Sequence, residues 1–265
     1  MKKTYPTEFV FQTVSLIVAV ILVQTLYALF IRPQANLILA EQAAHMMADA
    51  NYVQERSLLV IIRDYEQESC FVLMLWAMAI MAYKGVQAAR ERRLLQMDLI
   101  PVSEGTKILP EDAREYARQI ESLPDREQHL LLPRALLSAL ARFRATRNIQ
   151  DASDTAHGVA QAESERLDSE LSMLRYIAWA IPAIGFIGTV RGIGDALAQA
   201  HRAVTGDISG VTENLGVAFN STLIALLLSM VLMFLLHHLQ LQQERLALDT
   251  ETYLDRHLIQ HLQVS

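Results

Sequence analysis

The sequence predicts an all-α fold, that of a polytopic membrane protein with four transmembrane helices and a helical cytoplasmic domain. Three observations lead to this prediction. Hydrophobic residues make up 52% of the 265 residues, which excludes a disordered chain. Four windows, residues 9–31, 70–83, 176–190 and 214–236, hold no Asp, Glu, Lys or Arg. Elsewhere the apolar residues recur at helical spacing, and no alternation typical of strands occurs.

The first and last of these windows are long enough to span a membrane, because each has 23 residues. A helix rises about 1.5 Å per residue, and the hydrocarbon core is about 30 Å thick. Residues 69–89 reach full length if Lys84 extends its amine to the interface, and residues 176–196 do so if Arg191 is accommodated. We therefore expect four spans.

The beginning of the chain has some features of a cleavable signal peptide, because Lys2 and Lys3 precede the first apolar run. That run is longer than the apolar part of such a signal and lacks a clear small-x-small exit, so we interpret it as a retained anchor. The single cysteine, Cys70, begins the second span, and we expect it to serve in packing.

The basic residues predict the orientation. Residues 84–175 hold 14 of the 23 Lys and Arg residues, whereas residues 32–69 hold three of them beside six carboxylates. By the positive-inside rule the long loop is cytoplasmic, and four spans then place both termini in the cytoplasm. We interpret RERR at 90–93 as a topology anchor, with a partner-docking patch as the alternative. The net charge of −6 argues against nucleic-acid binding.

The cytoplasmic loop is divided by prolines into short helical segments, and its last part suggests a helix that enters the third span without a break. After the fourth span, Leu254, Leu258 and Leu262 share one helix face. The expected organisation is an N-terminal segment with the first transmembrane helix (1–31), a periplasmic segment (32–68), the second transmembrane helix (69–89), a helical cytoplasmic domain (90–174), a channel domain with the third and fourth transmembrane helices (175–238) and a cytoplasmic helical tail (239–265).

Small residues form one stripe along each of the last two spans. The stripe of the third span consists of Ala178, Pro182, Gly185, Thr189, Gly192 and Ala196, and that of the fourth consists of Ala218, Thr222, Ala225 and Ser229. Such faces let another helix approach closely, and ordinary helix packing is the simplest interpretation.

The two stripes each hold a threonine at a similar depth. Thr189 lies 14 residues after Arg175, and Thr222 lies 15 residues before His237. Both hydroxyls therefore fall about 21–22 Å into the membrane and could share one level. Alternatively, each hydroxyl bonds to the carbonyl four residues back in its own helix.

Both stripes also carry a family resemblance. The third span contains PAIGFIGTVRGIGDAL (182–197), which closely resembles the Pro-x-x-Gly-x-x-Gly-Thr-Val-x-Gly-Ile signature of the MotA/TolQ/ExbB proton-channel family. The fourth contains LGVAFNSTLIALLLSM (215–230), which resembles the second motif of that family. Thr189 and Thr222 match the family's pore threonines, and Pro182 matches its third-helix proline.

This resemblance implies a homo-pentamer around a dimer of a single-span partner similar to MotB, ExbD or TolR, in the bacterial inner membrane. A membrane Asp of the partner would carry H⁺, with Na⁺ as the alternative. The residues themselves agree, because no carboxylate lies in the inner part of any predicted span, and hydroxyls do not titrate near pH 7. We expect this chain to form the wall of the pathway. The four-span layout resembles the MotA branch.

The candidate site has three predicted parts. They are an ion pathway (Thr189, Thr222, Ser221 and Asn220), a helix-packing or pore-lining set (Pro182, Gly185, Gly188, Gly192, Ala218 and Ala225) and a structural ion pair (Arg191 with Asp195). Arg191 departs from the family, which commonly has an aromatic or apolar residue there; a gate is the alternative role. Ala225 and Val231 stand where the family often has Gly and Pro.

Conventional enzyme chemistry is not expected. His257 and His261 have the spacing of a helical metal pair, but no third ligand accompanies them, so we expect no metal and no cofactor. No nucleophile elbow or phosphate loop occurs. Two hypotheses follow. The first is an ion-channel stator subunit that converts ion-motive force into rotation or mechanical work, for a flagellar, TonB- or Tol-like, or antiphage machine. The second is a non-conducting oligomeric scaffold or sensor.

Overall fold

The computed structural model describes residues 7–48, 57–97, 99–100 and 107–264, so Lys2 and Lys3 lie outside it. Within these ranges the chain is helical, with no strand and one isolated bridge between Ile108 and Leu262. The chain divides into two compact units. Unit 1 comprises Met1–Met81 with Met173–Leu236, and unit 2 comprises Ala82–Ser172 with His237–Ser265.

Four helices are long and apolar enough to cross a membrane, which confirms the predicted fold class. They cover Glu8–Met46, Tyr65–Leu94, Ile149–Ala198 and Ser209–His261. The chain is therefore a multi-pass membrane protein. Each helix is longer than the charge-free window that predicted it, because the absence of charge marks the part of a helix in hydrocarbon and not its ends.

The first helix continues beyond residue 31, where the predicted span ends. It consists of α1 (Thr7–Leu26), a π-helical turn η1 (Tyr27–Ile31) and α2 (Arg32–Ala48), which runs through the segment predicted to be periplasmic. Pro33 accounts for the wide turn, because its ring would clash with the carbonyl of Leu29 in a regular α-helix. The backbone N–H of Arg32 bonds instead to the carbonyl of Tyr27, five residues back.

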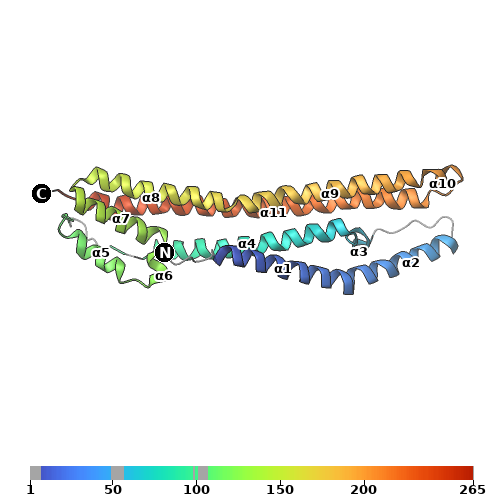
Figure 1. Cartoon of the computed structure of the whole chain (residues 1–265), viewed down its shortest axis with the longest axis horizontal. Coiled ribbons are helices and arrows are strands. Elements are labelled where there is room, and N and C mark those ends of the chain that lie inside the picture. Colours follow the sequence, from blue (N-terminus) through green and yellow to red (C-terminus); the bar gives the residue numbers. More distant parts are fainter. Residues whose placement is uncertain (1–6, 49–56, 98, 101–106, 265) are drawn as a thin grey trace. The chain divides into compact units, whose positions relative to one another are not determined.

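The rest of unit 1 packs as pairs of helices (Figure 1). After the short α3 (Leu58–Ile61), α4 (Tyr65–Leu94) lies beside α1, where Trp76 Nε1 donates to the carbonyl oxygen of Gln12 at 2.9 Å. The helices α9 (Ser172–Ala198) and α11 (Ser209–His257) lie side by side, joined by α10 (Ala200–Val204). Large apolar side chains cover their outer faces, and Phe186 and Phe219 are 65% and 69% exposed.

The helix that leads into the third span runs from Ile149 to Ala198, as the sequence predicted, with one irregular residue inside it. The helix α8 (Ile149–Glu170) ends one residue before α9 begins, and Leu171 between them closes a turn with its N–H on the carbonyl of Asp168. The side chain of Leu171 is fully buried. No helix-breaking residue stands at this position. The burial of the Leu171 side chain therefore accounts for the position of the turn.

Unit 2 is built around the hairpin of α7 (Leu131–Thr146) and α8, with α5 (Ala113–Glu121), α6 (Asp125–Gln128), the last part of α11 and η2 (Ile259–His261). Between α7 and α8, Arg147 adopts a φ of 52°, and Asn148 Oδ1 accepts from the N–H of Gln150 at 2.9 Å. The core includes Leu136, Leu140 and Phe143 of α7, Ala152 and Ala156 of α8, and Leu254, Leu258 and Leu262. The predicted apolar face of the tail is thus confirmed.

Candidate functional site: a threonine pair between two membrane helices

Glycines allow α9 and α11 to approach closely in unit 1. A Cβ atom placed on Gly188 would lie 2.5 Å from Ser221 Oγ, and one on Gly192 would lie 2.7 Å from a backbone carbonyl oxygen of α11. A Cβ on Gly185 would collide with that of Ala225. The small-residue stripes are therefore the surfaces through which two helices of one chain pack against each other.

Several of the residues predicted to pack or to line a pore are buried in this helix contact. They are Gly185, Gly188, Gly192, Ala218 and Ala225. Their burial against the neighbouring helix assigns them to packing rather than to an open lining. By contrast, a Cβ on Gly194, also in α9, would meet no atom within 4 Å.

The two predicted threonines meet across the helix contact. The hydroxyls of Thr189 and Thr222 are hydrogen-bonded to each other. Thr222 Oγ1 also lies 3.1 Å from the carbonyl oxygen of Gly185, and Thr189 Oγ1 lies 3.1 Å from that of Ala218 and 3.3 Å from that of Gly185. Thr189 thus fits both interpretations of the sequence: its hydroxyl meets that of Thr222 at one level, and it also lies within bonding distance of the carbonyl oxygen of Gly185 in its own helix. Both side chains are half-buried, so one edge of the pair remains accessible.

Chemically, this pair is a neutral network of donors and acceptors. A hydroxyl donates one hydrogen bond and accepts two, and neither threonine titrates near neutral pH. Because the bond between the two hydroxyls uses one of their two protons, one threonine donates to the other, and that other threonine donates to a carbonyl oxygen. The pair can orient a water molecule or a protonated acid at its accessible edge, but it cannot hold a charge by itself.

Of the other two residues of the predicted ion pathway, Ser221 shares an acceptor with Thr189, the carbonyl oxygen of Ala218. Ser221 is 1% exposed, and its Oγ donates within its own helix, 3.0 Å from the carbonyl oxygen of Val217 and 2.9 Å from that of Ala218. The hydroxyl of Ser221 faces Gly188 and is part of the packing. Asn220 is half-buried.

The proline of α9 is compensated by α11. Pro182 lacks an N–H, so the carbonyl of Ala178, four residues earlier, has no partner in its own helix. Ser229 Oγ donates to this carbonyl oxygen at 3.1 Å. A helix breaker inside a membrane is tolerated when a neighbouring helix satisfies the freed carbonyl, and Ser229 does so here. Sequence reasoning placed Ser229 in the stripe but did not find this role.

Arg191 makes the predicted ion pair with Asp195 and a closer, two-point pair with Glu66 of α4. Arg191 Nε donates to Glu66 Oε1 at 2.7 Å, and Nη2 donates to Oε2 at 2.8 Å. The distance from Arg191 Nη1 to Asp195 Oδ2 is 3.9 Å. The i, i+4 pair therefore exists as a minor contact. Sequence reasoning missed Glu66 because it precedes the second predicted span and no pattern links it to the third.

Further ion pairs join the helices of unit 1 near the same ends. Arg32 of α2 pairs with Glu68 of α4, and Arg63 Nη2 lies 3.1 Å from Glu213 Oε1 of α11. Outside the spans, burial raises the pKa of the Asp64 carboxyl, although Arg63 acts in the opposite direction. Each of the four long helices of the unit thus carries a charged side chain that forms an ion pair with a neighbouring segment of the chain.

Comparison with known proteins assigns this arrangement to a family. Residues 127–252, just under half of the chain, match the model of the MotA/TolQ/ExbB proton channel family. The chain carries a MotA/TolQ/ExbB proton channel family domain. The match includes both threonines and extends from the end of α6 into α11, beyond the two motifs at residues 182–197 and 215–230 that carried the resemblance. No curated protein and no solved structure matches the chain significantly.

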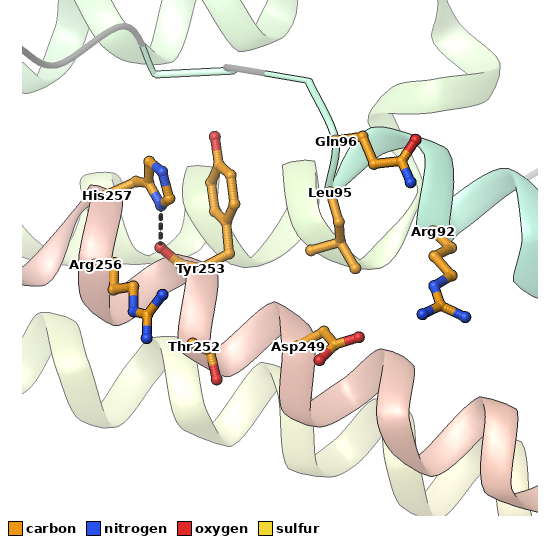
Figure 2. A pocket seen from close by; sticks show the side chains of 8 residues that line it. All are labelled: Arg92, Leu95, Gln96, Asp249, Thr252, Tyr253, Arg256 and His257. Carbon is orange, nitrogen blue, oxygen red and sulfur yellow. Dashed lines mark hydrogen bonds between the residues drawn. The ribbon is translucent and has the colours of Figure 1, made fainter.

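The MotA/TolQ/ExbB domain contributes to a second, more polar feature in unit 2. A hollow of about 320 Å³ lies between the end of α4 and the last turns of α11; Figure 2 shows the side chains that line it. It is lined by Arg92, Leu95, Gln96, Asp249, Thr252, Tyr253, Arg256 and His257. The charged side chains are exposed, and carboxylate and guanidinium groups both line it. It therefore has no group desolvated for catalysis, and the threonine pair remains the better candidate.

In the part of the chain that the structure describes, no cluster of three His, Cys, Asp or Glu side chains that could hold a metal ion occurs. His257 uses Nδ1 for a contact of 3.1 Å with the carbonyl oxygen of Tyr253, and its ring stacks on the Tyr253 ring at 4.1 Å. The ring of His257 thus packs within the tail.

Proposed function

We propose that this chain is the channel subunit of an ion-driven stator in the bacterial inner membrane. Five copies would surround a dimer of a single-span partner similar to MotB, ExbD or TolR, whose membrane Asp carries H⁺ or Na⁺. Ion flow would then rotate the pentamer about the dimer or produce other mechanical work. Each charge moved across 100 mV supplies about 2.3 kcal/mol, so a few ions provide useful work.

The observation that carries the proposal is the contact between Thr189 and Thr222, on the two membrane helices that belong to the family domain. Neither helix offers a carboxylate at that depth. Ion transfer through hydrocarbon needs an ionisable group, and the nearby carboxylate of Glu66 on α4 is held by Arg191, so we infer that the carrier comes from another chain. A half-buried pair of hydroxyls is suited to orient the protonated carboxyl of such a partner without competing for its proton.

The alternative of a non-conducting scaffold has less support. That hypothesis assigned the small-residue stripes to contacts between copies of the chain. Gly185, Gly188 and Gly192 are instead buried by α11 of the same chain, so these residues are already used within one molecule. The exposed surface that remains on α9 and α11 is formed by large apolar side chains.

The first test is the composition of the complex purified from native membranes. We expect the chain to co-purify with a single-span protein that has an Asp in its membrane segment, at five copies to two by native mass spectrometry. A homo-oligomer with no such protein, obtained after mild detergent extraction, would contradict the stator assignment and favour the scaffold.

The second test is ion flux through that complex in proteoliposomes, measured with a pH-sensitive dye. Thr222→Val removes the hydroxyl with little change of shape, whereas Thr222→Ser keeps the hydroxyl. One hydrogen bond contributes about 1 kcal/mol, so we expect Thr222→Val to lower flux roughly fivefold or more and Thr222→Ser to lower it little. Equal flux in both variants, in complexes of normal composition, would refute the role of the threonine.

A further inference from the structure

The strongest contact between the family domain and the rest of unit 1 is the ion pair of Glu66 and Arg191. Two nearly parallel hydrogen bonds of 2.7 and 2.8 Å join one carboxylate to one guanidinium. Such a two-point contact fixes orientation as well as distance, which a lysine at position 191 could not do. The side chain of Glu66 is 11% exposed and that of Arg191 is 44% exposed, so only the Glu66 side of the pair is buried.

The same carboxylate side chain also lies against the helix contact itself. A Cβ on Gly188 would lie 3.0 Å from Glu66 Cγ and 2.6 Å from Ser221 Cβ. Gly188 is therefore the point where α4, α9 and α11 meet. Because Gly188 and Arg191 are three residues apart, they share one face of α9, and Glu66 covers that face.

Thr189 lies next to this face, one residue after Gly188 and two before Arg191. Rotation of α9 by about 20° would move a group roughly 4 Å from its axis by about 1.4 Å, which is enough to break a hydrogen bond. The glycines of α9 offer little steric resistance to such a rotation, because they present no side chain to α11. A contact with a third helix is needed to set the rotation.

We propose that Glu66 is a positioning residue of the threonine pair: through Arg191 it sets the rotation of α9 about its axis, so that the hydroxyl of Thr189 meets that of Thr222. The helix α4, which contributes no group to the pair, thereby controls its geometry. The role in ion flow rests on the proposed function, whereas the geometric role does not.

Disulfide formation between Thr189→Cys and Thr222→Cys tests the geometry in the full chain, with Cys70→Ala to remove the native thiol. In membranes treated with copper phenanthroline, we expect Glu66→Gln to slow this cross-link roughly fivefold, the effect of about 1 kcal/mol of lost positioning. The exchange Glu66→Arg with Arg191→Glu should restore most of the rate.

Two controls distinguish positioning from general loosening. Glu68→Gln removes a second arginine-paired carboxylate of α4, whose partner Arg32 lies on α2 and not on α9, so the cross-link should form at the parental rate. A second cysteine pair, Ala178→Cys with Ser229→Cys, reports the far part of the α9–α11 contact and should be insensitive to Glu66→Gln.

The proposal is overturned if Glu66→Gln leaves the Thr189–Thr222 cross-link unchanged, if Glu68→Gln slows it equally, or if the Ala178–Ser229 cross-link slows in parallel. These results do not depend on ion flux. If the cross-links behave as expected but the purified complex conducts no ions, the geometric inference stands and the stator assignment fails.

Discussion

The two units of this chain are stabilised by different kinds of contact. In unit 2, large side chains such as Leu136, Leu140 and Phe143 are completely buried, and the exposed residues are mostly charged or polar. In unit 1, the middle of the contact between α9 and α11 consists of glycine, alanine, serine and threonine, while side chains such as Phe186 and Phe219 lie outside. Large apolar side chains thus cover the outer faces of these two helices, where unit 2 has polar ones.

The solvent explains this difference. Water drives apolar side chains of unit 2 into a core, at about 25 cal/mol per Å² of buried surface. Lipid tails are as apolar as leucine, so burying a leucine in unit 1 gains nothing, and close backbone contact with interhelical hydrogen bonds must hold the helices together. The two units should therefore respond in opposite ways to a change in side-chain size.

The largest expected effect is the truncation of a large side chain in unit 2. Phe143→Ala leaves a cavity between α7 and α8, and we expect it to lower the free energy of unfolding of this unit by about 3–5 kcal/mol. Hydrogen–deuterium exchange of α7 and α8 in detergent-solubilised protein measures this loss. Arg144→Ala, on the exposed side of the same helix, should change exchange little. Equal effects of both variants would show that α7 has no buried face.

The opposite change, enlargement of a small residue, should be harmful in unit 1. Gly188→Leu would force the side chain against Ser221 and Glu66, and we expect a loss of about 1–3 kcal/mol. Gly194→Leu is the matched control, because its Cβ would meet open space in the same helix. Thermal unfolding in detergent compares the two. If both leucines are tolerated alike, close packing of α9 on α11 is not what stabilises unit 1.

The sequence alone predicted the parts of this architecture that depend on one helix at a time. The four spans follow from the exclusion of charge, and the level shared by Thr189 and Thr222 follows from helix rise. The face of Leu254, Leu258 and Leu262 follows from helical spacing. All of these are local regularities, which a periodic pattern records.

Contacts between helices distant in the sequence were not predictable in this way. Glu66 and Arg191 are separated by 125 positions, and no periodicity relates them, so the local Asp195 was the only partner visible. The turn at Leu171 likewise depends on burial of its side chain and not on a helix-breaking residue. The prediction was incomplete where tertiary packing adds a partner or a local irregularity.

A smaller effect is expected at the end of a helix in unit 2. Asn148→Ala removes the side-chain acceptor for the N–H of Gln150, and the loss of an N-cap costs about 1 kcal/mol. Faster amide exchange confined to the first turn of α8 would record this loss. Asn148→Asp keeps an acceptor and should exchange at the parental rate. Uniform acceleration along α7 and α8 would argue that Asn148 has a role beyond capping.

The smallest expected effect lies in the pair formed by Pro182 and Ser229, and it depends on the lipid environment. Ser229→Ala removes one interhelical hydrogen bond, a loss of about 0.6 kcal/mol on average within membranes. With Pro182→Ala, residue 182 regains an N–H for the carbonyl of Ala178, so the hydroxyl of Ser229 is no longer needed there. A double-mutant cycle of thermal stability should therefore show a smaller cost of Ser229→Ala in the Pro182→Ala protein. An equal cost in both proteins would mean that Ser229 does not compensate for the proline, and that the carbonyl of Ala178 is satisfied in another way.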